Sequence, residues 1–228
     1  MSSSSTSSHV VVEQLHLNFG SPTILLSTVN EDGTFHLSVT SDALFKGANA
    51  VVGLDGSSFT AANIRRTGEC VINIAGEANA LAVQRLMDLS QLDQLPRLPR
   101  NDGSLPPRDD FDVAGMTALS SISIAPKRVH ECPIHLEAYA MSSYGLKDAS
   151  EKVSDAQQLF ELRVQRIHVL PSLLGDRFDD RISAEKWKPL ITVNDKLYGL
   201  RDRQSSNSML EAISRSLAAQ SVIERLPT

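Results

Sequence analysis

The sequence is poor in cysteine and lacks long apolar runs and the common nucleotide-binding, metal-binding and hydrolase motifs. It has two cysteines in 228 residues, Cys70 and Cys132, without the paired spacing of a disulfide scaffold. No apolar run approaches the ~20 residues that a membrane-spanning helix needs. The glycine-rich loops of nucleotide-binding folds, the HExxH and CxxC metal spacings and the GxSxG elbow of many hydrolases are missing too. We therefore expect two buried, reduced thiols, no metal site and no spanning helix.

Positive charge is also scarce. The chain has 22 lysines and arginines against 27 acidic residues, a formal net charge of -5 and a pI near 5.7. A nucleic-acid partner requires a basic face, and no basic cluster is visible in the sequence. The apolar fraction of 41% is ordinary for a globular chain that buries one core. We expect a cytoplasmic protein with neither a nucleic-acid nor a membrane partner.

Histidine is present but scattered, at positions 9, 16, 36, 130, 135 and 168. A lone histidine in a strand is more often a packing residue than a catalyst. The sequence therefore offers no side chain to which a catalytic role can be assigned.

The strongest local pattern lies at 57–74, where Ser-Ser-Phe-Thr-Ala-Ala-Asn at 57–63 opens a short helix. Its hydroxyls are suited to cap the first turn, and Gly68 is suited to end the helix with a positive φ. Alternating apolar residues then predict a strand over 70–75. The start of this helix is a candidate anion site, since its backbone N–H groups lack partners within the helix. The alternative is an ordinary capped helix.

Period-two alternation predicts further strands before and after this segment. We expect strands at 22–29, 36–41, 50–54, 121–124 and 134–139, with Asp32-Gly33 as a hairpin turn. Apolar parity changes within 160–169, which predicts a β-bulge. A last hairpin is expected at 190–200 around Asn194-Asp195.

Helical spacing at 77–95 predicts an amphipathic helix that places Leu81 and Leu86 on its apolar side and Arg85 outward, and the prolines after it predict a loop over 95–112. The expected fold class is mainly β with added helices, in an antiparallel barrel. We divide the chain into a disordered serine-rich tail (1–9), a barrel domain (10–202) and a C-terminal helix (203–228).

Taken in order, several segments resemble the flavin reductase-like family, whose members are FMN-binding split barrels. The resemblance covers roughly 20–202. Its segments are 22–33, 36–41, 57–74, Ala-Gly-Met-Thr at 114–117, Pro-Ile-His-Leu-Glu-Ala at 133–138, Trp-Lys-Pro-Leu at 187–190 and Tyr-Gly-Leu at 198–200.

The resemblance implies an FMN pocket formed by the loop after the second strand and the start of the following helix. Lys46 and Arg65 lie near this pocket and are suited to balance the negative charge of the FMN phosphate. The alternative is that both side chains are solvated, as exposed cations more often are. Two positions depart from the family: His36 stands where many relatives have asparagine, and Asp42 where many have serine. The implied cofactor-binding residues are Thr40, Ser41, Asp42, Lys46, Ser57, Ser58, Thr60, Asn63, Arg65 and Tyr198, the last with barrel packing as its alternative role.

The resemblance implies an FMN-dependent oxidoreductase of the flavin reductase type, a homodimer that takes hydride from NADH or NADPH and passes electrons to free flavin or another acceptor. The alternatives are a flavin-binding protein without turnover, for which Asp42 is the warning, and a non-flavin interaction protein that retains only the barrel.

Overall fold

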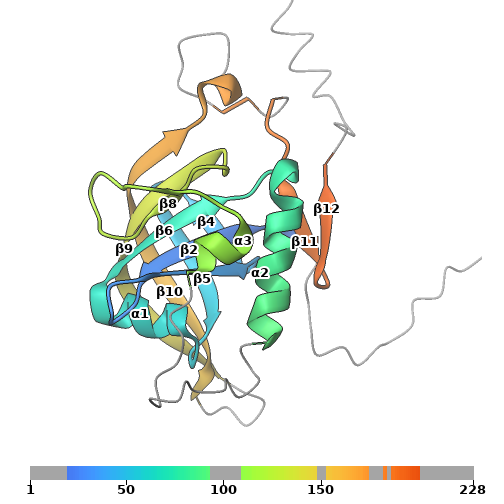
Figure 1. Ribbon diagram of the computed structural model, residues 1–228. Helices are drawn as coiled ribbons and strands as arrows, with labels where there is room; N and C mark the ends of the chain where they lie inside the picture. The colour runs from blue at the N-terminus through green and yellow to red at the C-terminus, as the bar shows by residue number, and fades with distance from the viewer. Residues whose placement is uncertain (1–19, 93–108, 148–152, 175–181, 184–185, 201–228) are drawn as a thin grey trace, which may run out of the picture.

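The computed structural model describes residues 20–92, 109–147, 153–174, 182–183 and 186–200 (Figure 1). The expected tail at 1–9 and the expected C-terminal helix at 203–228 lie outside these residues. In the described part of the chain, no helix has both the length and the apolar character needed to cross a membrane.

The main element is a seven-stranded antiparallel sheet with the strand order β3-β2-β6-β9-β10-β5-β4. Every pair of neighbours in it is antiparallel, as expected from a chain of short strands. Its strands are β2 (Ile24–Val29), β3 (Phe35–Thr40), β4 (Ala43–Lys46), β5 (Asn49–Asp55), β6 (Glu69–Ile74), β9 (Ile134–Lys147) and β10 (Val153–Val169). The predicted fold class, mainly β with added helices, is confirmed.

Smaller elements surround this sheet (Figure 1). A three-stranded sheet has the order β1-β11-β12, from β1 (Ser21–Pro22), β11 (Leu190–Val193) and β12 (Lys196–Gly199), and a two-stranded sheet joins β7 (Ala118–Leu119) to β8 (Arg128–Val129). The α-helices are α1 (Phe59–Thr67), α2 (Ala80–Leu92) and α3 (Asp110–Ala114), with 3-10 turns η1 (Glu77–Asn79) and η2 (Pro171–Leu173).

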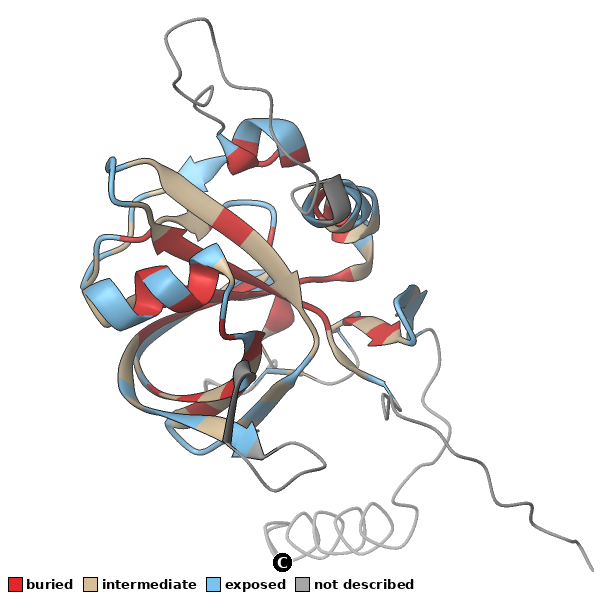
Figure 2. Ribbon diagram, turned by 90° about the horizontal axis from the view of Figure 1, so that it is seen from below, coloured by how far each residue is buried: buried red, intermediate tan, exposed pale blue. Residues whose placement is uncertain are grey.

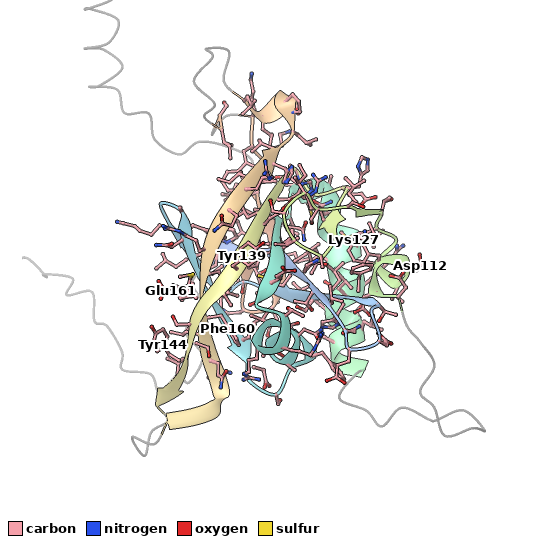
Figure 3. The ribbon with its side chains drawn as sticks, turned by 90° about the vertical axis from the view of Figure 1, so that its left-hand side faces the viewer. Asp112, Lys127, Tyr139, Tyr144, Phe160 and Glu161 are labelled. Carbon is pink, nitrogen blue, oxygen red and sulfur yellow. The ribbon has the colours of Figure 1, made fainter. Side chains whose placement is uncertain are left out.

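The long pair β9 and β10 bends around the barrel, and Figure 3 marks its course with Tyr139 and Tyr144 on β9 and Phe160 and Glu161 on β10. The register between the two strands shifts after Glu161 and again between Val164 and Arg166. An extra residue in one strand turns its following side chains to the other face. The bulge predicted from the parity change within 160–169 is confirmed.

The sheet buries both of its faces. Inside the curve, α1 packs Ala61 and Ile64 against strand residues such as Ile72 and Phe160. On the other face, α2 and α3 cover Leu25 and Leu37. Figure 2 shows these buried segments along the inner wall of the barrel and on the sides of the helices that face it. Burial on both faces explains why three apolar residues, Ile24, Leu25 and Leu26, follow one another in β2.

The helix and strand predicted at 57–74 form as expected. The Ser58 hydroxyl caps α1 by accepting from the Ala61 N–H at 3.2 Å, and Gly68 ends the helix at φ 71°. Cys70 lies fully buried in β6, and burial raises the pKa of its thiol to about 12. Burial also raises the pKa of the Cys132 thiol. Both cysteines are free and buried, as predicted.

The strand predicted at 121–124 is wrong: no strand covers these residues, and Ile122 is 65% exposed. The N–H groups of Ile122 and Ser123 instead donate to the two oxygens of the buried Glu137 carboxylate, at 2.8 and 2.7 Å. A backbone N–H bound to a side chain is not available to a sheet ladder. The alternation seen in the sequence therefore belongs to a loop fixed by a carboxylate.

Two predicted helix and loop boundaries also change. Helix α2 starts at Ala80 after the turn η1, and it buries Val83 and Leu86 while Leu81 is 67% exposed. Within the predicted loop, the structure places helix α3, whose N-cap Asp109 accepts the Phe111 N–H at 2.9 Å. The rest of that loop, 95–108, lies outside the described residues. Strand β4 was not predicted from the sequence.

Candidate functional site

A pocket of about 440 Å³ opens between β3, β5, the start of α1 and one side of α2. Its wall is mixed, with hydroxyl groups, apolar side chains and two carboxylates. The lining residues are His36, Leu37, Ser38, Val39, Thr40, Asp42, Gly53, Leu54, Asp55, Ser57, Ser58, Phe59, Thr60, Leu86, Leu89, Ser90 and Gln157.

One end of the pocket is the first turn of α1. Ser57 donates to Asp55 Oδ1 through its backbone N–H at 2.7 Å and through its hydroxyl at 2.6 Å. These two hydrogen bonds lower the pKa of the Asp55 carboxyl group, which therefore stays ionised at neutral pH. The Thr60 hydroxyl turns toward β3 and donates to Ser38 Oγ at 2.7 Å. The helix start is therefore tied to both neighbouring strands.

The loop after β3 forms a second side of the pocket. The Asp42 N–H donates to Thr40 Oγ1 at 3.1 Å, and the Gly53 N–H donates to the Asp42 carbonyl at 2.7 Å. The loop runs so close to β5 that a Cβ atom added at Gly53 would lie 3.0 Å from the Cβ of Asp42. These contacts fix Asp42 in the wall of the pocket beside Thr40.

The third side of the pocket lies where β3 meets α3, and the sequence did not predict it. His36 Nδ1 lies 2.6 Å from Asp110 Oδ2, and the same oxygen accepts the Leu37 N–H at 3.1 Å. The His36 ring also meets the edge of Phe59 on α1, at 6.0 Å between centroids. His36 stood out in the sequence only as a departure from the family. Nothing in the sequence connected it with Asp110, which lies 74 residues further on.

Five of the ten residues expected at the site lie elsewhere or outside the lining. The Asn63 amide donates to Thr28 Oγ1 at 3.0 Å and to Asn30 Oδ1 at 2.8 Å. Arg65 donates to the Gly56 carbonyl at 2.9 Å. Tyr198 belongs to the separate sheet of β1, β11 and β12. Ser41 and Lys46 flank the pocket residues in sequence without lining it.

The other five expected residues do line the pocket: Thr40, Asp42, Ser57, Ser58 and Thr60. A volume of this size suits a drug-sized ring system, because ligand pockets span about 300–1,000 Å³. Hydroxyl groups beside apolar side chains suit a flat heteroaromatic ring. A phosphate fits less well, since Asp42 and Asp55 are acidic and no described lining residue is lysine or arginine. Among the described residues, no group of three His, Cys, Asp or Glu side chains is placed to hold a metal ion.

No family model matches the sequence. The uncharacterized protein YdfE of Bacillus subtilis (strain 168) is 30% identical over 182 residues, which cover 80% of this chain and 84% of YdfE. Among solved structures, nitrilotriacetate monooxygenase component B from Bacillus cereus is similar, with a TM-score of 0.66, 20% identity and coverage of 82% of this chain and 88% of that one.

The styrene monooxygenase flavin reductase SMOB from Pseudomonas putida S12 has a TM-score of 0.53 and 13% identity, and the match covers 82% of this chain and 95% of that one. At these identities, the structures establish the fold, whereas the similarity to YdfE extends to the sequence. The chain therefore belongs to the same protein family as YdfE, and its fold is the split barrel of the flavin reductases.

Proposed function

We propose that the pocket between β3, β5 and α1 binds a flavin, and that the protein is an oxidoreductase that transfers hydride from NADH or NADPH through this flavin to a further acceptor. The observation that carries the proposal is the pocket itself: about 440 Å³, with hydroxyl and apolar groups around it, in a split barrel of the flavin reductase kind. Flavin supplies the hydride acceptor when bound, so the protein has to supply position and hydrogen bonds.

The lining residues provide these functions in different ways. Val39, Leu54 and Leu89 offer apolar surface to the ring, and Ser57 at the first turn of α1 offers its hydroxyl oxygen as an acceptor, because the hydroxyl hydrogen is donated to Asp55. Helix α1 also directs its positive dipole end into the pocket, which favours a ligand that gains negative charge on reduction. These features support flavin in general; FMN is the specific cofactor that we propose from the resemblance.

A flavin-binding protein without turnover is the second candidate. Its support is the pair of carboxylates, Asp42 and Asp55, in the pocket wall. Because like charges repel, these groups oppose a bound phosphate and a negatively charged reduced ring.

A visible spectrum taken before and after addition of NADH or NADPH tests both candidates. The protein is purified, mixed with FMN, riboflavin or FAD, and separated from free ligand by gel filtration without oxygen. Retained visible absorbance of the flavin that bleaches with nicotinamide supports the oxidoreductase. Retained absorbance that persists supports binding without turnover, and loss of all three flavins on the column contradicts both.

A further inference from the structure

His36 and Asp110 form a fixed pair in the wall of the pocket. The His36 side chain is 13% exposed and the Asp110 side chain 4%, with 2.6 Å between Nδ1 and Oδ2. The same Asp110 oxygen is held by the N–H of Leu37, the residue after His36. The carboxylate is therefore positioned by the backbone of the strand that carries the histidine.

This arrangement determines which ring nitrogen of His36 is available to a ligand. An ionised carboxylate only accepts hydrogen bonds, so Nδ1 carries a hydrogen toward Asp110. Among the described residues, no group bonds to Nε2, and His36 lines the pocket. The ring contact with Phe59 limits rotation of the imidazole. Nε2 is therefore the polar atom that His36 offers to the pocket.

The charge of the wall gives His36 a distinct role. The other titratable side chains in the described lining are Asp42 and Asp55, which are both acidic. His36 is thus the one described lining residue whose side chain can carry a positive charge, and histidine changes charge between about pH 5 and 8. Flavin rings present mainly acceptor atoms, two carbonyl oxygens and ring nitrogens, to their surroundings. A hydrogen bond from Nε2 to such an atom needs a second proton on the imidazole, since the first is committed to Asp110.

We propose that His36 is a specificity-determining residue that binds an acceptor atom of the flavin ring. It does so as an imidazolium, through Nε2–H, and this role rests on the proposed function. Asp110 is its positioning residue, which holds Nδ1–H and offsets the positive charge. At a pH where the imidazole is neutral without ligand, binding takes up one proton from solvent at Nε2, and release returns it. No electron passes through His36.

The charged groups around β3 support this assignment. Among the described residues, Asp110 is the charged group whose side chain is bonded to His36. Strand β2, opposite, presents Thr28 to His36. The remaining charged side chains on the packed helices α1 and α2 are bonded elsewhere: Arg65 to the Gly56 carbonyl, Arg66 to the Val29 carbonyl, Arg85 to the Ala114 carbonyl and Asp88 to Gln84. On α3, Asp112 and the cap Asp109 flank Asp110.

Calorimetric titration with riboflavin tests the proposal, since riboflavin has the ring and no phosphate. Titrations in two buffers of different ionisation enthalpy, at one pH, give the number of protons taken up on binding. We expect uptake in the wild-type protein, none in His36→Gln, and reduced uptake with weaker affinity in Asp110→Asn. The matched control is His130→Gln, because His130 is exposed and outside the lining. It should behave as the wild type.

The pH dependence gives a second readout. If binding takes up one proton, riboflavin affinity can rise by at most about tenfold for each unit by which the pH falls. This dependence of affinity on pH should vanish in His36→Gln. If His36→Gln does not fold, ¹⁵N spectra of the histidine rings in the wild-type protein replace it. Riboflavin should then move one Nε2 resonance to the protonated range.

The outcomes separate the two proposals. Binding of riboflavin without proton uptake, or with equal uptake in His36→Gln and the wild type, overturns the role of His36 and leaves the proposed function standing. Absence of any flavin binding in the wild-type protein overturns the proposed function and the role of His36 with it.

Discussion

Oε1 of Glu137 lies 2.7 Å from Nε2 of His168, on the long strand pair that bends around the barrel. The Glu137 side chain is fully buried, and its carboxylate also accepts the N–H groups of Ile122 and Ser123. Arg166 Nε donates to Ser123 Oγ at 3.1 Å and Tyr139 donates to the Ser123 carbonyl at 2.9 Å. One buried charge thus anchors a loop of the chain to the outer wall of the barrel.

We predict that Glu137→Gln destabilises the fold by about 1–3 kcal/mol near neutral pH, because the amide NH2 group cannot accept a hydrogen bond and leaves one backbone N–H of the loop without an acceptor. Burial raises the pKa of Glu137, but the hydrogen bonds from Ile122, Ser123 and His168 outweigh burial and lower the pKa below its ordinary value of 4.5. A lowered pKa stabilises the fold above the pH at which the unfolded group titrates, so this contribution is lost as the pH falls below about 4.5.

Urea unfolding from pH 7 down to pH 3 measures this effect. The difference in unfolding free energy between wild type and Glu137→Gln should shrink toward acid pH. Exposed Glu31 next to the β2–β3 turn provides the control, and Glu31→Gln should unfold as the wild type at each pH. A constant difference across this range would contradict the role of the ionised carboxylate.

Asn63 and Thr60 lie three residues apart on α1 but should respond differently to substitution. Asn63→Ala removes a buried amide and leaves Thr28 and Asn30 without it, which should cost about 1–3 kcal/mol of stability. Thr60→Val preserves the shape and removes the hydroxyl bonded to Ser38 in the pocket wall. We expect it to weaken riboflavin binding by about fivefold, the equivalent of about 1 kcal/mol.

Thermal unfolding and fluorescence titration measured on both variants separate the two effects. Equal losses of flavin affinity in Asn63→Ala and Thr60→Val, at unchanged stability, would place Asn63 in the binding site after all.

Asp42 should discriminate between flavins with and without phosphate. Two like charges about 6 Å apart repel by roughly 2–3 kcal/mol at an effective dielectric constant near 20, before screening by salt. Asp42→Ser should therefore tighten FMN binding by one to two orders of magnitude and leave riboflavin nearly unchanged. Titrations with both ligands in low salt measure this, with Asp88→Ser on the exposed side of α2 as the control. Equal responses of FMN and riboflavin would remove Asp42 from the phosphate position.

We also predict a homodimer, with about twice the 24.8 kDa chain mass in light scattering coupled to gel filtration. The apolar side chains of Leu44, Met141 and Tyr144 are 66%, 66% and 57% exposed on β4 and β9 (Tyr144 is labelled in Figure 3), and exposed apolar groups of this kind favour association. Met141→Glu with Tyr144→Glu should then give the monomer mass. A wild-type monomer at micromolar concentration would contradict the prediction.

Local features of the fold were predictable from the sequence because their causes are local. The Ser58 cap, the Gly68 stop and the turn at Asn194-Asp195, with φ values of 47° and 59°, follow from residue types that prefer these conformations. The bulge in β10 was visible because a parity change in apolar residues reports directly on which face is buried.

For the candidate site, the sequence by itself implied ten residues through a resemblance in residue order, and five of them line one pocket: Thr40, Asp42, Ser57, Ser58 and Thr60. It could not pair His36 with Asp110, nor Glu137 with the amides of 122–123, because these contacts depend on the path of the chain in space. A buried carboxylate has to find hydrogen-bond donors wherever the fold brings them. Only the tertiary structure decided that Asp110 bonds to His36 in the wall of the pocket. It also decided that Glu137 holds the loop at 122–123, whose sequence alternates between apolar and polar residues as a strand does.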